Sequence, residues 1–218
     1  CMSWINYIDE RFDKKKNILL YGVSMGASTA VMATGFDDIS KSVKAVVSDC
    51  AFTSPYDVFS HILKRDYKLS QFPVMNMNNR ICNKKAGYGF KDYSTLDAVV
   101  KTDIPILFIH GKEDDFVPVY MTERNFNACN SEKELLYVEN AGHGASYYEN
   151  PALYEEKVKD IYIRAVKDTF GDIPYAVAND GDVSALAGAL SLKDNNVLGI
   201  AMGTSEAVGY VDKNGKIT

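Results

Sequence analysis

The chain has 218 residues, of which 46% are hydrophobic and 24% are charged, and its formal net charge is −5. This length suits one substantial domain, or one domain and a piece of another, but not two complete α/β domains. The composition is that of a soluble globular protein: the negative charge argues against nucleic acid or an anionic membrane as the main partner, and we expect no membrane segment, because no apolar run approaches the roughly 18 residues that cross a bilayer.

The spacing of apolar residues predicts a helix, a strand and a second helix at the start of the chain. A helix is predicted by apolar side chains at helical spacing, and a polar segment at 13–17 ends it. The apolar run 18–20 predicts a strand, and the Ala-rich segment 25–33 predicts a second helix. The side chains that indicate the first helix are Trp4, Ile5, Ile8 and Phe12.

The segment Gly22-Val23-Ser24-Met25-Gly26 is a Gly-x-Ser-x-Gly motif between the predicted strand and the predicted helix. A serine at such a turn suits a nucleophile elbow, because a tight, strained turn requires residues without bulky side chains. The following helix places its free amides and the positive end of its dipole beside Ser24. An ordinary Gly/Ser turn in a βα unit is the alternative interpretation, since the motif alone also occurs by chance.

A second βα unit follows the first. Segment 43–50 predicts a largely buried strand, and Ser54-Pro55 begins a helix that runs to about Tyr67. From 68 to 101 the periodicity weakens, which is typical of an insertion that forms a substrate lid or a wall of a binding site. Its aromatic side chains either line an apolar acyl site or belong to the core: Phe72, Tyr88, Phe90 and Tyr93.

The clearest strand of the sequence is the apolar run 104–109. It is followed by a predicted helix at 117–129, a strand at 134–138 and a long helix at 151–170. The core spacing in the last helix involves Tyr154, Val158, Ile161, Tyr162 and Ala165. The chain becomes richer in Gly, Ala and Asn after this helix, so we place a domain boundary there, between residues 1–170 and 171–218.

Only three histidines are candidates for the base that a serine nucleophile needs. His61 lies within a predicted helix, and His110 ends a predicted strand, so we expect structural roles for both. His143 lies in a loop of small residues directly after a strand, where an imidazole can approach a neighbouring strand end. We therefore predict that His143 is the catalytic base.

The orienting acid is sought in the cluster Glu113-Asp114-Asp115, at the C-terminal end of the best strand. Open α/β sheets carry their chemistry at this end of their strands, which favours a functional role for one member of the cluster. The alternative for an acid in such a loop is a solvated helix cap, and we consider that alternative for Asp115. Asp49, at the end of another strand, is expected to be structural. The order serine, acid, histidine is that of the α/β-hydrolases.

Three segments resemble the signature loops of the α/β-hydrolase superfamily, in particular its bacterial serine-esterase and prolyl-oligopeptidase-like branch: 22–26, 110–118 and 141–143. The segment 48–54 is also similar, and the likeness covers about residues 1–170. It implies an α/β-hydrolase fold, three-layered with a mostly parallel sheet. It further implies that Ser24 is the nucleophile, His143 the general base, Asp114 its orienting partner, and the Met25 backbone N–H an oxyanion donor.

The likeness also implies that part of the fold precedes this sequence. In that superfamily the strand before the elbow is the fifth of eight, and a second oxyanion donor comes from the loop after the third strand. Losing one such donor costs about 2.7 to 4 kcal/mol of transition-state stabilisation. We expect an N-terminally truncated fragment in which segment 17–22 is an exposed apolar edge that favours self-association. Its initial Cys1 fits a chain that starts within a longer protein.

The segment 171–218 weakly resembles part of a sugar kinase of the actin-like ATPase superfamily. By that resemblance Asp180 corresponds to the base, and Gly203 and Thr204 to the phosphate-binding turn. Ser205 replaces the expected glycine, and the likeness covers fewer than 50 residues. The alternative interpretation is a C-terminal helix followed by a β-hairpin with ordinary glycine turns.

Together these patterns predict a serine hydrolase that cleaves an ester or a similar acyl bond through an acyl-enzyme intermediate. The alternatives are a peptidase of the same fold, or a catalytically silent fragment fused to a sugar-kinase-like remnant. We expect a small-molecule ester or short peptide as substrate, and no metal or organic cofactor. The four scattered cysteines indicate neither a zinc knuckle nor a disulfide framework, which favours a reducing, cytoplasmic location.

Overall fold

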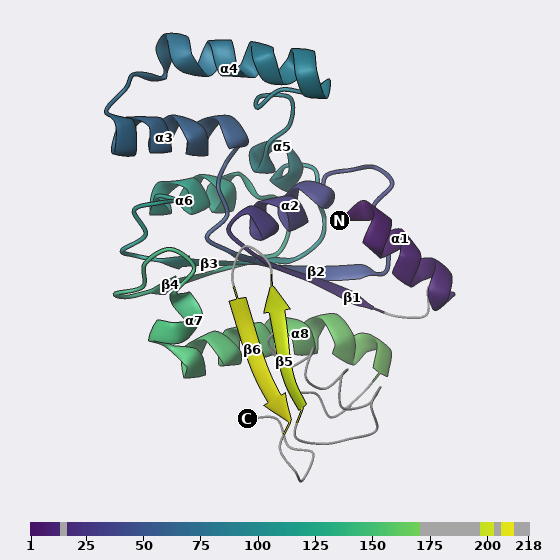
Figure 1. Ribbon diagram of the computed structural model, residues 1–218. Coiled ribbons are helices and arrows are strands. Elements are labelled where there is room, and N and C mark those ends of the chain that lie inside the picture. The colour runs from purple at the N-terminus through teal and green to yellow at the C-terminus, as the bar shows by residue number, and fades with distance from the viewer. Residues whose placement is uncertain (14–16, 171–196, 203–205, 212–218) are drawn as a thin grey trace. The chain divides into compact units, whose positions relative to one another are not determined.

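The computed structural model describes residues 1–13, 17–170, 197–202 and 206–211 (Figure 1). The chain divides into two units, Cys1–Asp172 and Ile173–Thr218. The first unit contains a four-stranded parallel sheet in the order β1-β2-β3-β4. The expected α/β class with a parallel sheet is confirmed. Its strands are β1 (Ile18–Val23), β2 (Val43–Asp49), β3 (Ile106–Gly111) and β4 (Lys133–Val138).

Helices connect these strands and flank them. They are α1 (Met2–Arg11), α2 (Met25–Ala33), α3 (Pro55–Tyr67), α4 (Gln71–Ala86), α5 (Thr95–Val99), α6 (Val119–Ala128), α7 (Ser146–Glu149) and α8 (Pro151–Phe170). Two boundaries differ from the predictions because of proline. The third strand begins after Pro105, which has no N–H to donate, and α6 begins after Pro118, which occupies its N-cap position.

The two faces of the sheet bury alternate residues of each strand, as a sheet covered on both sides requires. Leu107 and Ile109 of β3 belong to the apolar cluster that includes the buried face of α8. Ile106 and Phe108 belong to the opposite cluster, with residues of α2 and α5. Figure 1 shows α2 and α6 on one side of the strands and α8 on the other. The three expected layers are therefore present in this unit.

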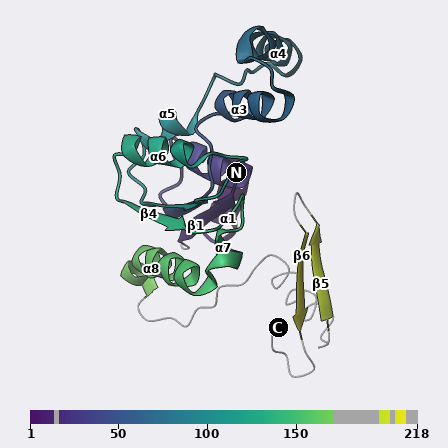
Figure 2. The same cartoon turned by 90° about the vertical axis from the view of Figure 1, so that its left-hand side faces the viewer.

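The segment between α3 and β3 is more helical than we predicted. Weak periodicity at 68–101 suggested an irregular insertion, but the structure contains the 16-residue helix α4 and the short helix α5 there. Figures 1 and 2 show α4 beside α3, with α3 lying between it and the rest of the unit. Of the α4 side chains only Met75 is buried. A helix with so little buried surface carries almost no amphipathic signal, which explains why the sequence pattern missed it.

Strand β1 is at the edge of the sheet, where it pairs with β2 in parallel. Tyr21 and Val23 of this strand are exposed, whereas Ile18 and Gly22 are buried. Within the described residues, no strand adjoins the other side of β1. The edge that the sequence predicted is therefore open in this unit.

The second unit contains the antiparallel pair β5 (Val197–Met202) and β6 (Glu206–Val211), as expected for a hairpin. The predicted helix of this segment and the candidate residues Asp180, Gly203 and Thr204 lie outside the described residues. In the part of the chain that the structure describes, none of the helices combines the length and the apolar character needed to cross a membrane.

Candidate active site

Ser24 occupies the sharp turn between β1 and α2. Its backbone has φ 56° and ψ −116°, a region that non-glycine residues rarely adopt. The strand holds one side of the turn, because the Ser24 N–H donates to the carbonyl of Asp49 at 2.8 Å. The helix holds the other side, since the Ser24 carbonyl accepts from the Ser28 N–H at 3.0 Å. The turn is thus fixed by the secondary structure on either side of it.

Only the first glycine of the Gly-x-Ser-x-Gly motif is sterically required here. A Cβ added to Gly22 would lie 2.3 Å from the Gly26 carbonyl carbon and 2.5 Å from the Ala27 nitrogen. A Cβ added to Gly26 would meet nothing within 4 Å. Gly22 therefore permits the close return of α2 over β1, whereas the expected steric need at Gly26 is absent in this structure.

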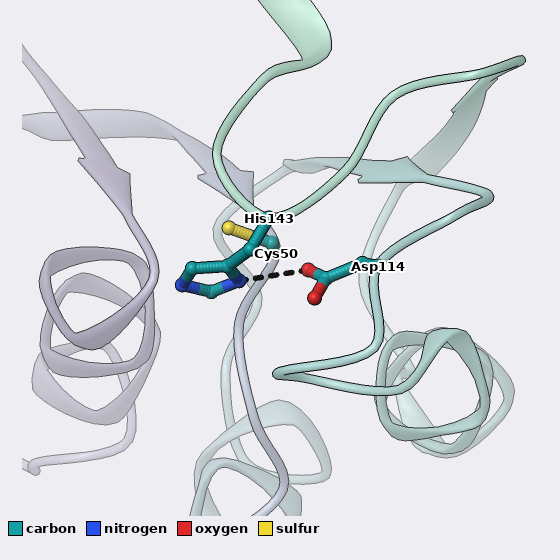
Figure 3. A group of neighbouring side chains, drawn as sticks. All are labelled: Cys50, Asp114 and His143. Carbon is teal, nitrogen blue, oxygen red and sulfur yellow. Dashed lines mark hydrogen bonds and ion pairs between the residues drawn. The ribbon is translucent and has the colours of Figure 1, made fainter.

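The loop after β4 brings His143 to Ser24. His143 Nε2 lies 2.9 Å from Ser24 Oγ, and His143 Nδ1 lies 2.8 Å from Asp114 Oδ2. Figure 3 shows the imidazole and the Asp114 carboxylate facing each other, with the hydrogen bond between them. The Phe116 ring packs against the imidazole, with 4.8 Å between ring centroids. The structure therefore brings together the three side chains that the sequence singled out.

The loop after β3 holds Asp114 by both carboxylate oxygens. The backbone N–H groups of Phe116 and Val117 donate to Oδ1 at 2.9 and 2.8 Å. Burial alone would raise the pKa of this carboxyl, but hydrogen bonds from His110, His143 and the Val117 N–H outweigh burial and lower the pKa below its ordinary value. Asp114 is therefore an ionised acceptor for the His143 Nδ1–H.

The other candidate acid and bases do not contact Ser24 in the way that His143 does. Asp115 is exposed, and its backbone carbonyl lies 2.9 Å from His61 Nε2. His110 is fully buried, and its Nδ1 lies 2.7 Å from Thr122 Oγ1. His110 Nε2 lies 2.8 Å from the Val117 carbonyl, so the loop-fixing position expected for this histidine agrees with its contacts. Its proximity to Asp114 was not expected from the sequence.

Asp49 ties the end of β2 to the helices that follow His143. Ser146 of α7 donates to Asp49 Oδ1 at 3.1 Å, and Tyr154 of α8 donates to Oδ2 at 3.0 Å. The Tyr154 hydroxyl also lies 2.9 Å from the Tyr21 hydroxyl. Burial raises the pKa of Asp49 to about 6, although both hydroxyl donors act in the opposite direction. These contacts match the structural role that we expected for Asp49.

The remaining predicted positions have fewer defining contacts. Met25 is the first residue of α2, where helix N–H groups have no partner within the helix. Tyr93 packs against an apolar core cluster, which favours a core role for it. Phe90 packs against the exposed ring of Phe59, and Phe72 and Tyr88 are exposed. Sequence reasoning missed Cys50, whose side chain lies behind His143 in Figure 3. Its position directly after a strand end was the available signal.

Comparison with known proteins shows similarity in sequence to a family and to individual relatives. A model of the prolyl oligopeptidase family matches residues 1–167. "Uncharacterized protein YqkD" of Bacillus subtilis (strain 168) is 29% identical over 156 residues, which are 72% of this chain and 51% of the relative. The chain therefore spans about half the length of that relative.

Solved structures resemble the chain in fold. The acylaminoacyl peptidase of Pyrococcus horikoshii matches 81% of this chain and 28% of its own, with a TM-score of 0.55 and 16% identity. An esterase of Pyrococcus furiosus matches 74% of this chain and 59% of its own, with a TM-score of 0.53 and 18% identity. At these identities the likeness shows the fold, which is the α/β-hydrolase fold that the sequence motifs predicted.

Proposed function

The chain belongs to the prolyl oligopeptidase family, and on this basis we propose that it is a serine hydrolase acting on ester or similar acyl bonds. The observation that carries the proposal is the continuous hydrogen-bonded series from Ser24 through His143 to Asp114. A serine hydroxyl is a weak nucleophile, and an imidazole within hydrogen-bond reach is what activates it.

In the proposed mechanism Ser24 Oγ attacks the acyl carbon while His143 Nε2 accepts the hydroxyl proton. Asp114 holds the Nδ1–H tautomer of His143 and stabilises the imidazolium that forms. The imidazolium then returns the proton to the leaving group, and an acyl-enzyme results. Water, deprotonated by His143, releases the acyl group and restores Ser24.

The negative oxygen of the tetrahedral intermediate needs hydrogen-bond donors. The Met25 backbone N–H is suited to this role, because Met25 immediately follows the nucleophile and begins α2. The positive end of the α2 dipole lies at the same point and favours the developing charge. One such donor contributes about 2.7 to 4 kcal/mol to the stability of the transition state.

A peptidase is the second candidate activity, and membership of the prolyl oligopeptidase family is the observation that favours it. The same three side chains serve both reactions, so the distinction depends on the leaving group. Comparing p-nitrophenyl esters with aminoacyl p-nitroanilides on the full chain separates them. Ester turnover without anilide turnover supports the esterase, and efficient anilide turnover supports the peptidase.

Labelling with a fluorophosphonate probe tests the hydrolase proposal. We expect stoichiometric labelling of the full chain and none of the Ser24→Ala variant. Ser60→Ala is the matched control, because the Ser60 hydroxyl lies on α3, where it donates to the Tyr56 carbonyl. Labelling that persists in Ser24→Ala, or that is absent from the folded wild-type chain, would overturn the proposal.

A further inference from the structure

Three side chains with different metal-binding atoms meet at the proposed active site, and the proposed catalytic base is one of them. A sulfur of Cys50, a carboxylate oxygen of Asp114 and a ring nitrogen of His143 all lie within 4.8 Å of one another (Figure 3). We propose that Cys50, Asp114 and His143 form a zinc-binding site, and that zinc bound there inhibits the enzyme. The inhibition rests on the proposed hydrolase function, whereas the binding site does not.

The three residues come from three strand ends, which fixes their backbone positions. Cys50 directly follows β2, and its N–H donates to the Ile109 carbonyl of β3 at 2.9 Å. The loops that carry Asp114 and His143 are joined, because the Glu113 N–H donates to the Ala141 carbonyl at 2.9 Å. The ligand atoms are therefore held near one another before any ion arrives, which lowers the entropic cost of binding.

The donor set suits zinc better than other common divalent ions. Zinc binds thiolate, imidazole and carboxylate ligands, commonly in a tetrahedral arrangement, whereas magnesium and calcium require oxygen ligands. Bond lengths of about 2.0 to 2.3 Å place tetrahedral ligand atoms roughly 3.3 to 3.6 Å apart. The present separations are all within 4.8 Å, so no pair of ligand atoms has to approach by more than about 1.5 Å. Three protein ligands leave the fourth position for water.

The charges around the thiol favour a cation. The Cys50 thiol lies close to the buried carboxyl groups of Asp49 and Asp114. A divalent cation displaces the thiol proton and compensates the thiolate and the Asp114 carboxylate together. The His143 side chain is 27% exposed and offers the approach from solvent.

Zinc at this position removes the proposed base. Coordination engages the imidazole and the carboxylate whose hydrogen bond holds the His143 tautomer. The imidazole is then unable to accept the Ser24 proton in the required orientation. We therefore expect zinc to suppress fluorophosphonate labelling, and a chelator to restore it.

The direct test is zinc binding to the metal-free full chain, measured by competition with a chromophoric chelator. We expect one equivalent to bind to the wild-type chain and the affinity to fall about tenfold or more in Cys50→Ser, because a hydroxyl is a poor zinc ligand. Cys129→Ser is the matched control, since Cys129 is also a buried free cysteine. Equal affinity of the wild-type chain and Cys50→Ser, or no binding by the wild-type chain, would overturn the site.

Cobalt provides a second measurement on the unaltered chain, which keeps the proposal testable if Cys50→Ser does not fold. We expect thiolate-to-cobalt charge transfer and the intense visible bands of tetrahedral cobalt, and spectra without them would contradict the site. Labelling separates the two proposals. If zinc binds through Cys50 but the fluorophosphonate probe never labels the chain, the zinc site is supported and the hydrolase proposal is wrong. If saturating zinc does not slow labelling by the probe, the proposed inhibition is wrong.

Discussion

His110 Nε2 lies 3.3 Å from Asp114 Oδ2, and neither side chain is exposed to solvent. The same Nε2 faces the Val117 carbonyl at 2.8 Å, so both of its neighbours are acceptors and Nε2 carries the proton. His110 Nδ1 then accepts from Thr122 Oγ1. The Asp114 carboxylate thus has a second imidazole, fully buried, in addition to the solvent-accessible His143. This arrangement fixes the carboxylate independently of the proposed base.

We predict that Asp114→Asn lowers kcat for p-nitrophenyl acetate by about 10⁴, because an amide cannot favour the Nδ1–H tautomer of His143 or stabilise the imidazolium. Asp115→Asn is the control. Its side chain is 89% exposed, so we expect its kcat to stay within about twofold of the wild-type value. Similar losses in both variants would show that Asp114 has no special role.

Replacing Gly22 or Gly26 by alanine should change the stability of the chain in opposite directions. A new methyl group at Gly22 meets the backbone of α2 at 2.3 Å, so Gly22→Ala must displace the helix and the turn at Ser24. We expect Gly22→Ala to lose at least about 2 kcal/mol of unfolding free energy, as overpacked sites do. Gly26→Ala should gain about 0.5 to 1 kcal/mol, since Gly26 is helical and has space for a methyl group. Urea unfolding of both variants measures the difference, and a stable Gly22→Ala would contradict this account of the motif.

The pattern of apolar residues located most of the fold because buried positions follow the geometry of each element. The β3 strand is buried throughout, and the helix at 151–170 buries Tyr154, Val158 and Ile161, so both had strong patterns. The three candidate catalytic residues, Ser24, Asp114 and His143, could be predicted for a different reason. Parallel strands place the loops that follow them at one edge of the sheet. The α/β class was therefore predictable before any coordinates.

Other features depended on contacts that spacing does not encode. Cys50 approaches His143 only because the loops after β2 and β4 converge, although the residues are far apart in sequence. The His110 contact with Asp114 depends on the course of the loop after β3, which sets the direction of the carboxylate. Helix α4 was missed since it packs only one fully buried side chain against the domain. The sequence pattern therefore did not predict contacts between loops that are distant in the chain, or a helix that buries few side chains.

The buried carboxyl of Asp49 predicts an unusual dependence of stability on pH. Its pKa is raised to about 6 in the folded chain, above the ordinary value of 3.8. Between these values the folded state binds more protons than the unfolded state at this site, so its contribution to stability is fully present below pH 4. That contribution is lost as the pH rises through about 6. The loss is on the order of 3 kcal/mol.

Urea unfolding between pH 4 and pH 7 tests this dependence. We expect the stability of the wild-type chain, relative to Asp49→Asn, to fall as the pH rises over this range. The amide introduced by this substitution stays neutral and can still bond the hydroxyls of Ser146 and Tyr154, so the variant is a suitable reference. A relative stability that stays constant or rises with pH would show that Asp49 is ionised throughout in the folded chain.

The open edge of β1 predicts that successive amides of this strand alternate between slow and fast hydrogen exchange. The Ile18 and Ser24 N–H groups donate to the carbonyls of Ser42 and Asp49. Because successive amides of a strand point to opposite sides, those of Leu20 and Gly22 also face β2. The amides of Leu19, Tyr21 and Val23 then face outward, where the described residues provide no neighbouring strand.

Amide hydrogen exchange at two protein concentrations tests whether this edge self-associates. In dilute solution we expect slow exchange at Leu20 and Gly22 and fast exchange at Leu19 and Tyr21. If copies of the chain pair through β1, the outward amides become protected as the concentration rises, because they then donate to a second strand. The inward amides stay slow throughout and serve as the internal control. Outward amides that exchange equally fast at all concentrations would exclude pairing through this edge, even if sedimentation detected a dimer, and would place its interface elsewhere.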